Sequence, residues 1–548
     1  MVLELPNRGP DIGRLEERHM TASGGPPGLS RLSIQELLTA SVYPHAIVHL
    51  RLKETHLSWV ILTGRYAYKL KKPVKFAFVD ATTLERRRFL CHEELRLNHR
   101  FAPELYVDVV PVTRESGRLR VGGAGEPVEY AVRMQEFDES QELASRLDHG
   151  SVSANDMQGL AIRLADAHRL ASVAAEASPY GTIEAIRQPM FDNFSLLRAH
   201  LGDAGYLRLI ERLEDWTHES LTRRQSLVES RRLAGLVREC HGDLHARNIV
   251  HWQQQWLPFD CLEFDPALRW IDVISDVSFL YMDLVSRSRK DLASHFLSRY
   301  LEVSGDYNGL PLVPLYSAYL ALVRAKVDVL GAENASPAAC SSLRARRKRR
   351  LETAARFVDA VPPALIAMHG VTASGKSWLS ERLIGEIPAV RVRSDLERKR
   401  LAGVAALATR GFGVGEGDYS ELATQATYDR LLACAEAALD GPCSVIIDAA
   451  FLDRRHRDAF RALAQRKNRP FLLVSCFADS AVLASRLDAR AGSGADPSEA
   501  THAVLSRQLR DTQPLGADEA VQSLEFDMGR RTETEVLVKR VRERLGTR

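Results

Sequence analysis

The segment ALIAMHGVTASGKSWLSERL, residues 364–383, constrains the fold more than any other part of the sequence. A hydrophobic run is followed by a glycine-containing loop and then by a helical pattern. In such a strand, loop and helix the backbone N–H groups wrap around phosphates, while the lysine reaches the β and γ oxygens and the hydroxyl binds Mg²⁺. The sequence therefore predicts a complete Walker A motif for a nucleoside triphosphate. Its phosphate-binding residues are Gly370, Thr372, Ala373, Ser374, Gly375, Lys376 and Ser377.

The sequence around this motif alternates between strand and helix. The runs AVRVRS, CSVIIDAAF and PFLLVSCF are separated by helical segments, a pattern that predicts an α/β domain with a parallel sheet. We place this domain at 364–548, after a linker at 359–363 that contains two prolines. Asp448 ends one of the hydrophobic strands, where a carboxylate can assist Ser377 in binding Mg²⁺.

Three further residues of this domain are candidates for phosphoryl transfer. Asp395 follows the second strand, where a carboxylate can meet an acceptor hydroxyl or cap a helix. Arg486 and Arg490 are four residues apart, so both lie on one helix face before a glycine-containing loop, as in a lid. Arg490 has the alternative of pairing with Asp488 or Asp496.

Taken together, residues 362–548 resemble P-loop kinases of the zeta-toxin, chloramphenicol phosphotransferase and polynucleotide-kinase type. The resemblance implies that Asp395 is the catalytic base and that Arg486 and Arg490 are lid arginines.

A second motif, CHGDLHARNIV at 240–250, has the spacing of a kinase catalytic loop. His241, Asp243, Leu244 and Asn248 match the pattern H-x-D-L-x-x-x-N. Asp260 follows twelve residues after the asparagine, at the end of an apolar strand. A carboxylate for the acceptor hydroxyl, together with an amide oxygen and a second carboxylate for Mg²⁺, is the set that phosphoryl transfer needs.

Upstream of this loop a small sheet-rich lobe precedes a larger helical one. With the loop, this layout resembles the aminoglycoside phosphotransferase family, which includes choline and homoserine kinases, over residues 31–358. The resemblance implies an α+β, two-lobed, kinase-like fold. It assigns roles to these residues: Asp243 as general base, Asn248 and Asp260 as Mg²⁺ ligands, Lys69 on the α and β phosphates, Glu94 or Glu93 as the partner of Lys69, and Asp276 as a brace of the loop.

The sequence departs from that pattern above the phosphates. It has no G-x-G-x-x-G, and Gly64 is the only glycine in that part of the sheet. Lys71, Lys72 and Lys75 crowd the strand of Lys69, so a solvated basic edge is the alternative interpretation there.

Composition limits the classes of partner and location. The formal net charge of the 548 residues is only +3, which gives no global field for nucleic acid or membrane. The seven cysteines form no C-x-x-C pair, and no run of 18 apolar residues exists, so we expect a cytoplasmic protein with reduced thiols and no membrane span. Residues 1–30 are expected to be a disordered lead-in, with Met1 or Met20 as the start. The basic run Arg344–Arg350 is either a solvated helix face or a patch for phosphate or RNA.

The sequence therefore predicts two phosphotransferase domains, each binding ATP and Mg²⁺ and transferring the γ-phosphoryl group to a hydroxyl acceptor, most simply a small molecule. The order of the domains resembles bacterial proteins that fuse an aminoglycoside-phosphotransferase-like domain to a P-loop kinase-like domain. Two alternatives remain: a nucleotide-dependent regulatory protein in which one domain is a pseudokinase, and a nucleic-acid end kinase. The acceptors and the oligomeric state stay open.

Overall fold

The computed structural model describes residues 31–76, 79–332, 336–359, 361–404, 421–493, 502–529 and 534–546. The predicted lead-in at 1–30 lies outside them. By contacts the chain forms two compact units, and each is assembled from several stretches of sequence. The first unit comprises 1–152, 170–280 and 319–355, and the second comprises 153–169, 281–318 and 356–548. The domain limits 31–358 and 364–548 therefore do not coincide with this division and stay predictions.

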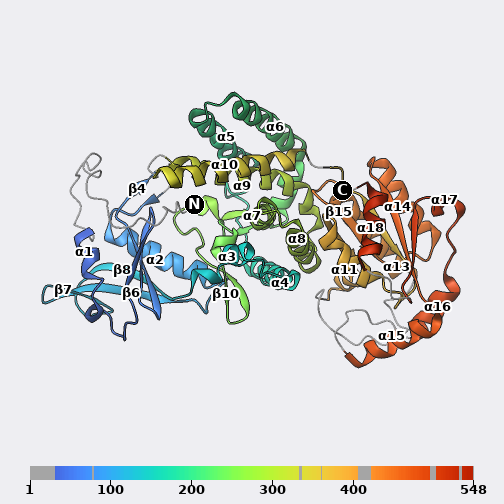
Figure 1. Ribbon diagram of the computed structural model, residues 1–548, viewed down its shortest axis with the longest axis horizontal. Helices are drawn as coiled ribbons and strands as arrows, with labels where there is room; N and C mark the ends of the chain where they lie inside the picture. The colour runs from blue at the N-terminus through green and yellow to red at the C-terminus, as the bar shows by residue number, and fades with distance from the viewer. Residues whose placement is uncertain are drawn as a thin grey trace. The chain divides into compact units, whose positions relative to one another are not determined.

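The first unit begins with an antiparallel sheet of six strands in the order β1-β2-β3-β8-β6-β7. Helix α2, Leu84–Asn98, packs on this sheet through β8 and β6 (Figure 1). Thr83 caps that helix by accepting the N–H of Arg86, and Leu90 and Leu97 are buried beneath it. The strands are β1 Arg51–Glu54, β2 Ser58–Leu62, β3 Tyr66–Lys71, β6 Tyr106–Glu115, β7 Arg118–Val121 and β8 Pro127–Gln135, with a separate short pair β4 Lys75–Phe76 and β5 Val79–Asp80.

Two short antiparallel pairs carry the predicted catalytic loop. β9, Val237–Glu239, pairs with β12, Trp270–Asp272, and β10, Ile249–Trp252, pairs with β11, Gln255–Pro258. The loop with Asp243 connects β9 to β10. The helices of this central stretch are α3 Leu143–Asp148, α4 Ala154–Leu170, α5 Ile183–His200, α6 Ala204–Leu233, α7 Val273–Ser286, α8 Lys290–Ser304, α9 Val313–Ala332 and α10 Pro337–Val358, and α1, Arg31–Glu36, precedes the sheet.

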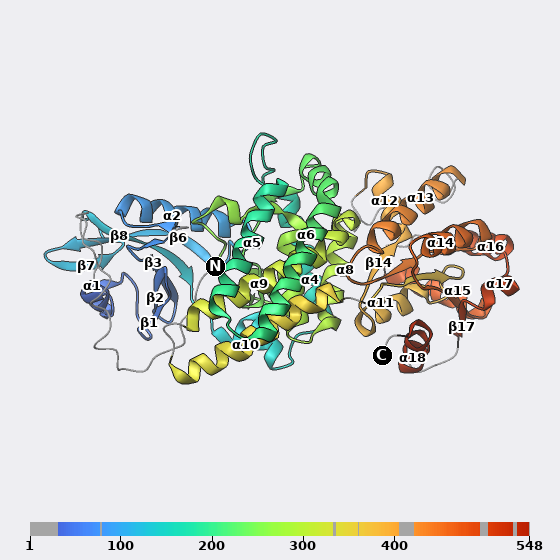
Figure 2. The same ribbon diagram turned by 90° about the horizontal axis from the view of Figure 1, so that it is seen from above.

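The second unit contains a parallel sheet of five strands in the order β14-β15-β13-β16-β17, which confirms the predicted parallel sheet. Figure 2 shows α11 and α18 on one face of this sheet and α13 and α14 on the other. Leu379 and Leu383 of α11 and Val541 of α18 pack with the strands in one buried cluster. The elements are β13 Leu365–His369, α11 Lys376–Glu386, β14 Ala389–Arg393, α12 Ser394–Leu401, α13 Glu421–Ala438, β15 Ser444–Asp448, α14 Arg454–Arg466, β16 Phe471–Phe477, α15 Ser480–Ser493, α16 His502–Asp511, α17 Ala517–Ala520, β17 Ser523–Asp527 and α18 Thr534–Leu545.

The edge strand β14 is covered by α8, a helix that lies before the linker in the sequence. Arg391 of β14 is buried, and its guanidinium binds Glu302 of α8 at 2.8 Å and Glu381 of α11 at 2.6 Å. Two carboxylates around one buried guanidinium satisfy its charge, so this contact locks α8 to the sheet. It explains why residues 281–318 belong with the parallel sheet.

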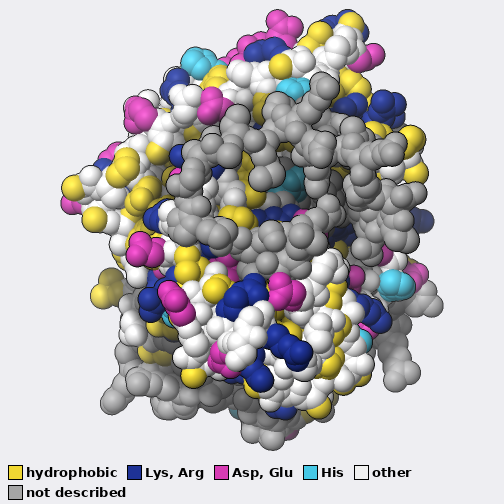
Figure 3. Space-filling model, turned by 90° about the vertical axis from the view of Figure 1, so that its left-hand side faces the viewer, with side chains coloured by type: hydrophobic (Ala, Val, Ile, Leu, Met, Phe, Trp, Pro, Cys, Tyr) yellow, Lys and Arg dark blue, Asp and Glu magenta, His cyan; other side chains and the backbone are white. Residues whose placement is uncertain are grey.

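Three further observations concern membrane spans, surface charge and cysteines. Among the described residues one helical segment, Tyr307–Ala332, has the length and mean hydropathy of a membrane span, but 72% of its apolar window is buried inside the structure, as in a core helix. On the face drawn in Figure 3, Lys/Arg and Asp/Glu side chains are interspersed, in keeping with the small net charge. All seven cysteines lie in described residues and are reduced thiols.

Candidate active sites

The loop between β9 and β10 is held from below by Asp276, at the start of α7. Its two carboxylate oxygens accept the backbone N–H groups of His241, at 3.1 Å, and Gly242, at 2.9 Å. Gly242 has φ +85°, and a Cβ there would lie 2.7 Å from the carbonyl oxygen of Leu268, so only glycine fits. The structure therefore places Asp276 where the predicted brace should be.

Asp243 and Asn248 face one another across this loop. The Asn248 amide donates to the Asp243 carbonyl at 3.0 Å and to its carboxylate at 3.1 Å, and both side chains are buried. Because the NH₂ group faces Asp243, the amide oxygen of Asn248 is oriented away from it. An oxygen donor in that position fits a hard cation such as Mg²⁺.

Asp260 joins this loop to the six-stranded sheet. Lys69 of β3 donates to Asp260 at 2.5 Å and to Glu94 of α2 at 2.7 Å. Asp260 has φ +64°, a conformation that costs free energy in a residue other than glycine and that persists here with its backbone N–H bound to the Tyr106 hydroxyl. Glu93, the other candidate partner of Lys69, binds Arg96 and Arg269 instead. The structure thus selects Glu94.

A second lysine of β3 shares this network. Lys71 is buried and donates to Glu94 and to Glu263, each at 2.5 Å. Lys72 binds the exposed Glu54, and Lys75 pairs with Asp80 at the surface. The crowded strand therefore divides into inward and outward lysines, and Lys69 is the one that bridges Glu94 to Asp260.

The charges of this site persist at neutral pH. Burial alone would raise the pKa of Asp243, but its interactions with surrounding groups, His245 first and Arg324 among the others, outweigh burial and leave that pKa well below its usual range. Burial opposes the ionised form of Asp260 too, and the Lys69 ammonium keeps its pKa low. Burial would lower the pKa of Lys69, yet Asp260 and Glu94 hold it well above the ordinary value. Asp243 and Asp260 are thus ionised carboxylates.

The hairpin of β1 and β2, which adjoins this site, has no glycine. Residues 55–57, between β1 and β2, form the turn at the Lys71 end of β3, whereas Gly64 lies at the other end, between β2 and β3. Leu57 packs with Leu262 and Phe264, just beyond Asp260. Gly64, the glycine that the sequence singled out, therefore lies at the end of the sheet away from Asp260.

Next to Asp243 lies a cavity of about 240 Å³. Asp243, Asn248 and Asp260 lie along its wall. Its cationic lining is Arg247, Arg324, Arg346 and Arg350. Two of these arginines come from the basic run 344–350, so the structure places part of that run beside the candidate base.

The loop after β13 in the second unit has the geometry of a phosphate-binding loop. Gly370 has φ +134°, and a Cβ there would lie 2.2 Å from the carbonyl oxygen of Cys476. Gly375 has φ +96° at the N-terminus of α11. Lys376 donates to the carbonyl of Val371 at 2.7 Å, and the N–H of Thr372 donates to the side chain of Gln508 at 2.6 Å. The backbone thus curls around a position where N–H groups and the lysine can meet phosphates.

The other predicted residues meet this loop around a cavity of about 690 Å³. Ser377, Asp395 and Asp448 all line it. Asp448 accepts the Ser380 hydroxyl at 3.1 Å and is buried at the end of β15. A hydroxyl and a carboxylate are oxygen donors of the kind that Mg²⁺ prefers, so the predicted pair fits the metal.

Asp395 is the second residue of α12, whose N-cap is Arg393, so it is not the cap that the sequence allowed. The Arg393 guanidinium binds the Asp395 carboxylate at 2.6 and 3.2 Å. Burial favours the neutral acid, but this guanidinium more than compensates and lowers the pKa of Asp395. The carboxylate therefore stays ionised at the wall of the cavity.

Of the two predicted lid arginines, the structure describes the side chain of Arg486 alone. Arg486 donates to the backbone carbonyls of Ala373, at 3.1 Å, and Met528, at 2.6 Å, so in this structure it supports the phosphate-binding loop from behind. The side chain of Arg490 lies outside the described residues. Among the described residues the arginines that line the cavity are Arg398, Arg455, Arg507 and Arg510.

Sequence reasoning missed α16 as part of this site. The helix carries Arg507, Gln508 and Arg510 into the cavity wall. The spacing of these residues, three polar positions within one turn, was the available signal. Tyr428 and His456 also line the cavity, and their rings stack with centroids 3.6 Å apart. This wall gives the second cavity an aromatic surface, as well as charges, for an acceptor.

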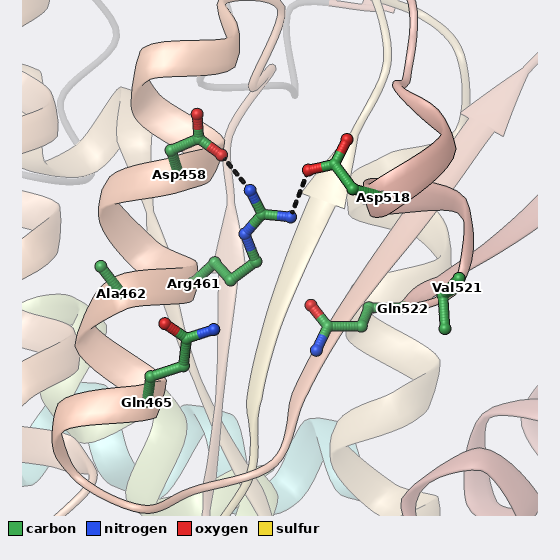
Figure 4. Close-up of a pocket in the computed structure, with 7 residues that line it drawn as sticks. All are labelled: Asp458, Arg461, Ala462, Gln465, Asp518, Val521 and Gln522. Carbon is green, nitrogen blue, oxygen red and sulfur yellow. Dashed lines mark hydrogen bonds and ion pairs between the residues drawn. The ribbon is translucent and has the colours of Figure 1, made fainter.

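A third hollow lies between α14 and α17. Figure 4 shows Arg461 between Asp458 and Asp518, and its guanidinium binds both carboxylates, at 2.5 and 2.9 Å. Arg454 binds the same two carboxylates, so the hollow is explained by ion pairing between two arginines and two aspartates.

Comparison with known proteins agrees with the second site. The model of a family described as an AAA domain matches residues 365–515. That match and the loop geometry identify this region as a P-loop nucleotide-binding domain. Among solved structures, a choline/ethanolamine kinase family protein from Mesorhizobium loti is 13% identical, with a TM-score of 0.34, over 57% of this chain and 94% of that one. A sugar kinase from Janibacter sp. is 20% identical, with a TM-score of 0.27, over 34% of this chain and 95% of that one. At these scores neither likeness carries weight for the fold.

Uncharacterized proteins of Mycobacterium tuberculosis and Mycobacterium bovis are 31% identical to this chain over 459 residues. The match covers 84% of this chain and 90% of theirs. The chain therefore belongs to the same family as these mycobacterial proteins.

Proposed function

We propose that the chain is an ATP-dependent phosphotransferase with two Mg-ATP sites, one in each unit, and that each transfers the γ-phosphoryl group to a hydroxyl acceptor. One observation carries the proposal: each of two separate cavities has an ionised carboxylate beside residues that are predicted to bind phosphate or Mg²⁺. Asp243 stands beside Asn248 and Asp260 in the first cavity, and Asp395 beside Lys376 and Ser377 in the second.

In the first site Asp243 orients the acceptor O–H and takes its proton as the new O–P bond forms and the bond to the ADP oxygen breaks. Lys69, fixed by Glu94, binds the α and β phosphates. Asn248 and Asp260 hold Mg²⁺, which neutralises phosphate charge when bound. The low pKa of Asp243 favours its role as a hydrogen-bond acceptor that positions the nucleophile, since phosphoryl transfer depends mainly on positioning and electrostatics.

In the second site the backbone N–H groups of 370–375 bind the phosphates, and Lys376 binds the β and γ oxygens. Ser377 and Asp448 hold Mg²⁺. Asp395 receives the acceptor proton, while Arg507 and Arg510 lie where charge on the transferring group can be stabilised. We also propose a cytoplasmic location, on the basis of the seven reduced thiols.

A metabolite extract incubated with γ-labelled ATP tests the proposal on the wild type, Asp243→Ala and Lys376→Ala. We expect two sets of labelled products, one lost in each variant. Identical product sets in all three proteins would contradict phosphoryl transfer at these sites. Loss of every product in either variant alone would contradict two independent sites.

A further inference from the structure

The cavity beside Asp243 is lined by more cations than anions. Arg247 comes from the catalytic loop, Arg324 from α9, and Arg346 and Arg350 from α10. Helices α9 and α10 lie side by side in both views (Figures 1 and 2). The acidic side chains of the lining are Asp243, Asp260 and Asp328, three against four. Asp260 is in addition paired with Lys69, so the remaining charge is positive.

Helix α10 separates its basic run into two faces. Arg346 and Arg350, one turn apart, line the cavity, whereas Arg344, Lys348 and Arg349 are exposed. Asp328 of α9 is fully buried and anchors the inner pair: Arg346 donates to one of its oxygens at 2.9 Å, and Arg350 donates to the other. One carboxylate thus fixes two guanidiniums. This anchoring sets the direction of the two arginines and cancels only part of their charge.

The arginines share their cavity with the base. The described lining contains Asp243 and the two predicted Mg²⁺ ligands, Asn248 and Asp260, but not Lys69 and Glu94, the pair predicted to serve the α and β phosphates. The four arginines thus share the Asp243 end of the site, away from Lys69, and we take this end to be where the acceptor binds. A cationic acceptor would be repelled there, whereas a guanidinium pairs with phosphate or carboxylate through two parallel hydrogen bonds. The volume of about 240 Å³ admits only a small molecule.

We propose that the acceptor of the Asp243 site is a small anionic alcohol, which carries a phosphate or carboxylate group that the arginines bind while its hydroxyl faces Asp243. This inference rests on the proposed function, because it names the acceptor class of that site. The reaction balances as above: the acceptor oxygen gains the phosphoryl group, ADP leaves, and the proton passes to Asp243.

The first test measures ADP release by the full chain with the P-loop site silenced by Lys376→Met. The probes are glycerol and ribose, their anionic counterparts glycerol 3-phosphate, glycerate and ribose 5-phosphate, and the cation choline. We expect stimulation by anionic probes only. Arg346→Gln should raise the KM for such a probe about 10- to 100-fold, with a smaller change in kcat, because a charged hydrogen bond is lost. The matched control is Arg344→Gln, on the exposed face of the same helix. Stimulation by glycerol, ribose or choline without their anionic counterparts would overturn the inference.

The second test is run whichever probe reacts. Binding of inorganic phosphate is measured by calorimetry in the same background, with Mg-ADP at saturation. Arg346→Gln and Arg324→Gln should each weaken it about 10- to 100-fold relative to Arg344→Gln. Arg324 is included because its side chain is not one that holds Asp328, so its loss leaves the α9–α10 anchor in place. Equal affinity in the three variants overturns the inference.

The two hypotheses fail in different ways. If Asp243→Ala does not lower ADP release with any probe, phosphoryl transfer at this site is wrong, and the phosphate titration still decides whether the cavity is an anion site. If ADP release depends on Asp243 but neutral alcohols are the better acceptors, the phosphotransferase stands and the anionic acceptor is wrong.

Discussion

The two candidate sites are built in different ways. In the first unit side chains from distant segments converge: Lys69 and Asp260 are 191 residues apart in sequence and meet at 2.5 Å. In the second unit six consecutive residues, 370–375, supply backbone N–H groups, and the glycines permit their conformation. The first site therefore depends on tertiary folding and the second largely on local geometry.

This difference determines how each site should fail. In a site built from side chains, each substitution removes the role of one residue, because the surrounding fold survives the substitution. A backbone site has few side chains to remove, and it fails when a Cβ or a changed φ closes the loop. The following predictions test this contrast, from the largest expected effect to the smallest.

The largest effect is expected from removing one proposed active-site side chain, Asp243 or Lys376, at a time. Asp243→Ala should lower turnover at the first site about 10²- to 10⁴-fold, because the acceptor loses its base, and leave the second site unchanged. Lys376→Ala should do the reverse, and the double variant should lose both. ADP release with acceptors assigned to each site measures the split. Lys75→Ala, a surface lysine that pairs with Asp80, is the control. Loss of both activities in either single variant would show that the sites are not independent.

Gly370→Ala tests the backbone site. A Cβ placed 2.2 Å from the carbonyl oxygen of Cys476, at φ +134°, forces the loop to move, so nucleotide binding at the second site should be lost. The strain is on the order of 1–3 kcal/mol or more, and it should lower the melting temperature of the second unit as well. Titration with a fluorescent ATP analogue in an Asp260→Asn background isolates this site. Gly159→Ala, where a Cβ meets nothing within 4 Å in α4, should retain full affinity. Normal binding by Gly370→Ala would mean that this glycine does not shape the loop.

The same contrast explains what sequence reasoning could and could not find. The phosphate-binding loop is contiguous, so Gly370, Lys376 and Ser377 were predictable, as was the parallel sheet around them. The choice between Glu93 and Glu94 was not, because adjacent residues on a helix point 100° apart and only the packing of α2 decides which faces β3. Arg346 and Arg350 could not be assigned either, since the inward face of α10 is set by Asp328, a buried residue on another helix. The contact of Arg486 with the carbonyl of Ala373 could not be predicted, because helix spacing does not report what a side chain touches, and its lid role stays a prediction.

Arg486→Ala and Arg507→Ala distinguish support of the loop from action on the substrate. Arg486 binds the carbonyls of Ala373 and Met528, so its loss should destabilise the second unit by about 1–3 kcal/mol and weaken nucleotide binding. Arg507 is exposed on α16 at the cavity wall, so its loss should lower kcat and leave stability within about 0.5 kcal/mol. Urea unfolding and steady-state kinetics on both variants provide the readouts. An Arg486→Ala protein with unchanged stability and reduced kcat would restore the predicted lid role.

The smallest effect concerns His369, which ends β13 immediately before Gly370. It is buried, its Nδ1 lies 2.9 Å from the Ser475 hydroxyl, and burial, with the charges of Arg457 and Lys376, lowers its pKa to about 4. The unfolded chain takes up a proton near pH 6.5, whereas the folded chain stays neutral until about pH 4, so stability is full above pH 6.5 and falls as the pH drops towards 4. Between pH 8 and 5 this one group should cost on the order of 2 kcal/mol.

His369→Asn removes that titration while keeping a polar group beside Ser475, so its unfolding free energy should depend less steeply on pH than that of the wild type. Urea unfolding at pH 8, 7, 6 and 5 measures the slope, with His502→Asn, an exposed histidine of the same unit, as the control. This variant tests whether His369 makes the second unit sensitive to acid. In the first site, by contrast, Asp243 keeps its charge at low pH. Equal slopes of unfolding free energy against pH in His369→Asn and the wild type would show that protons taken up elsewhere destabilise the second unit in acid. The difference in pH sensitivity between the two sites would then not arise from His369.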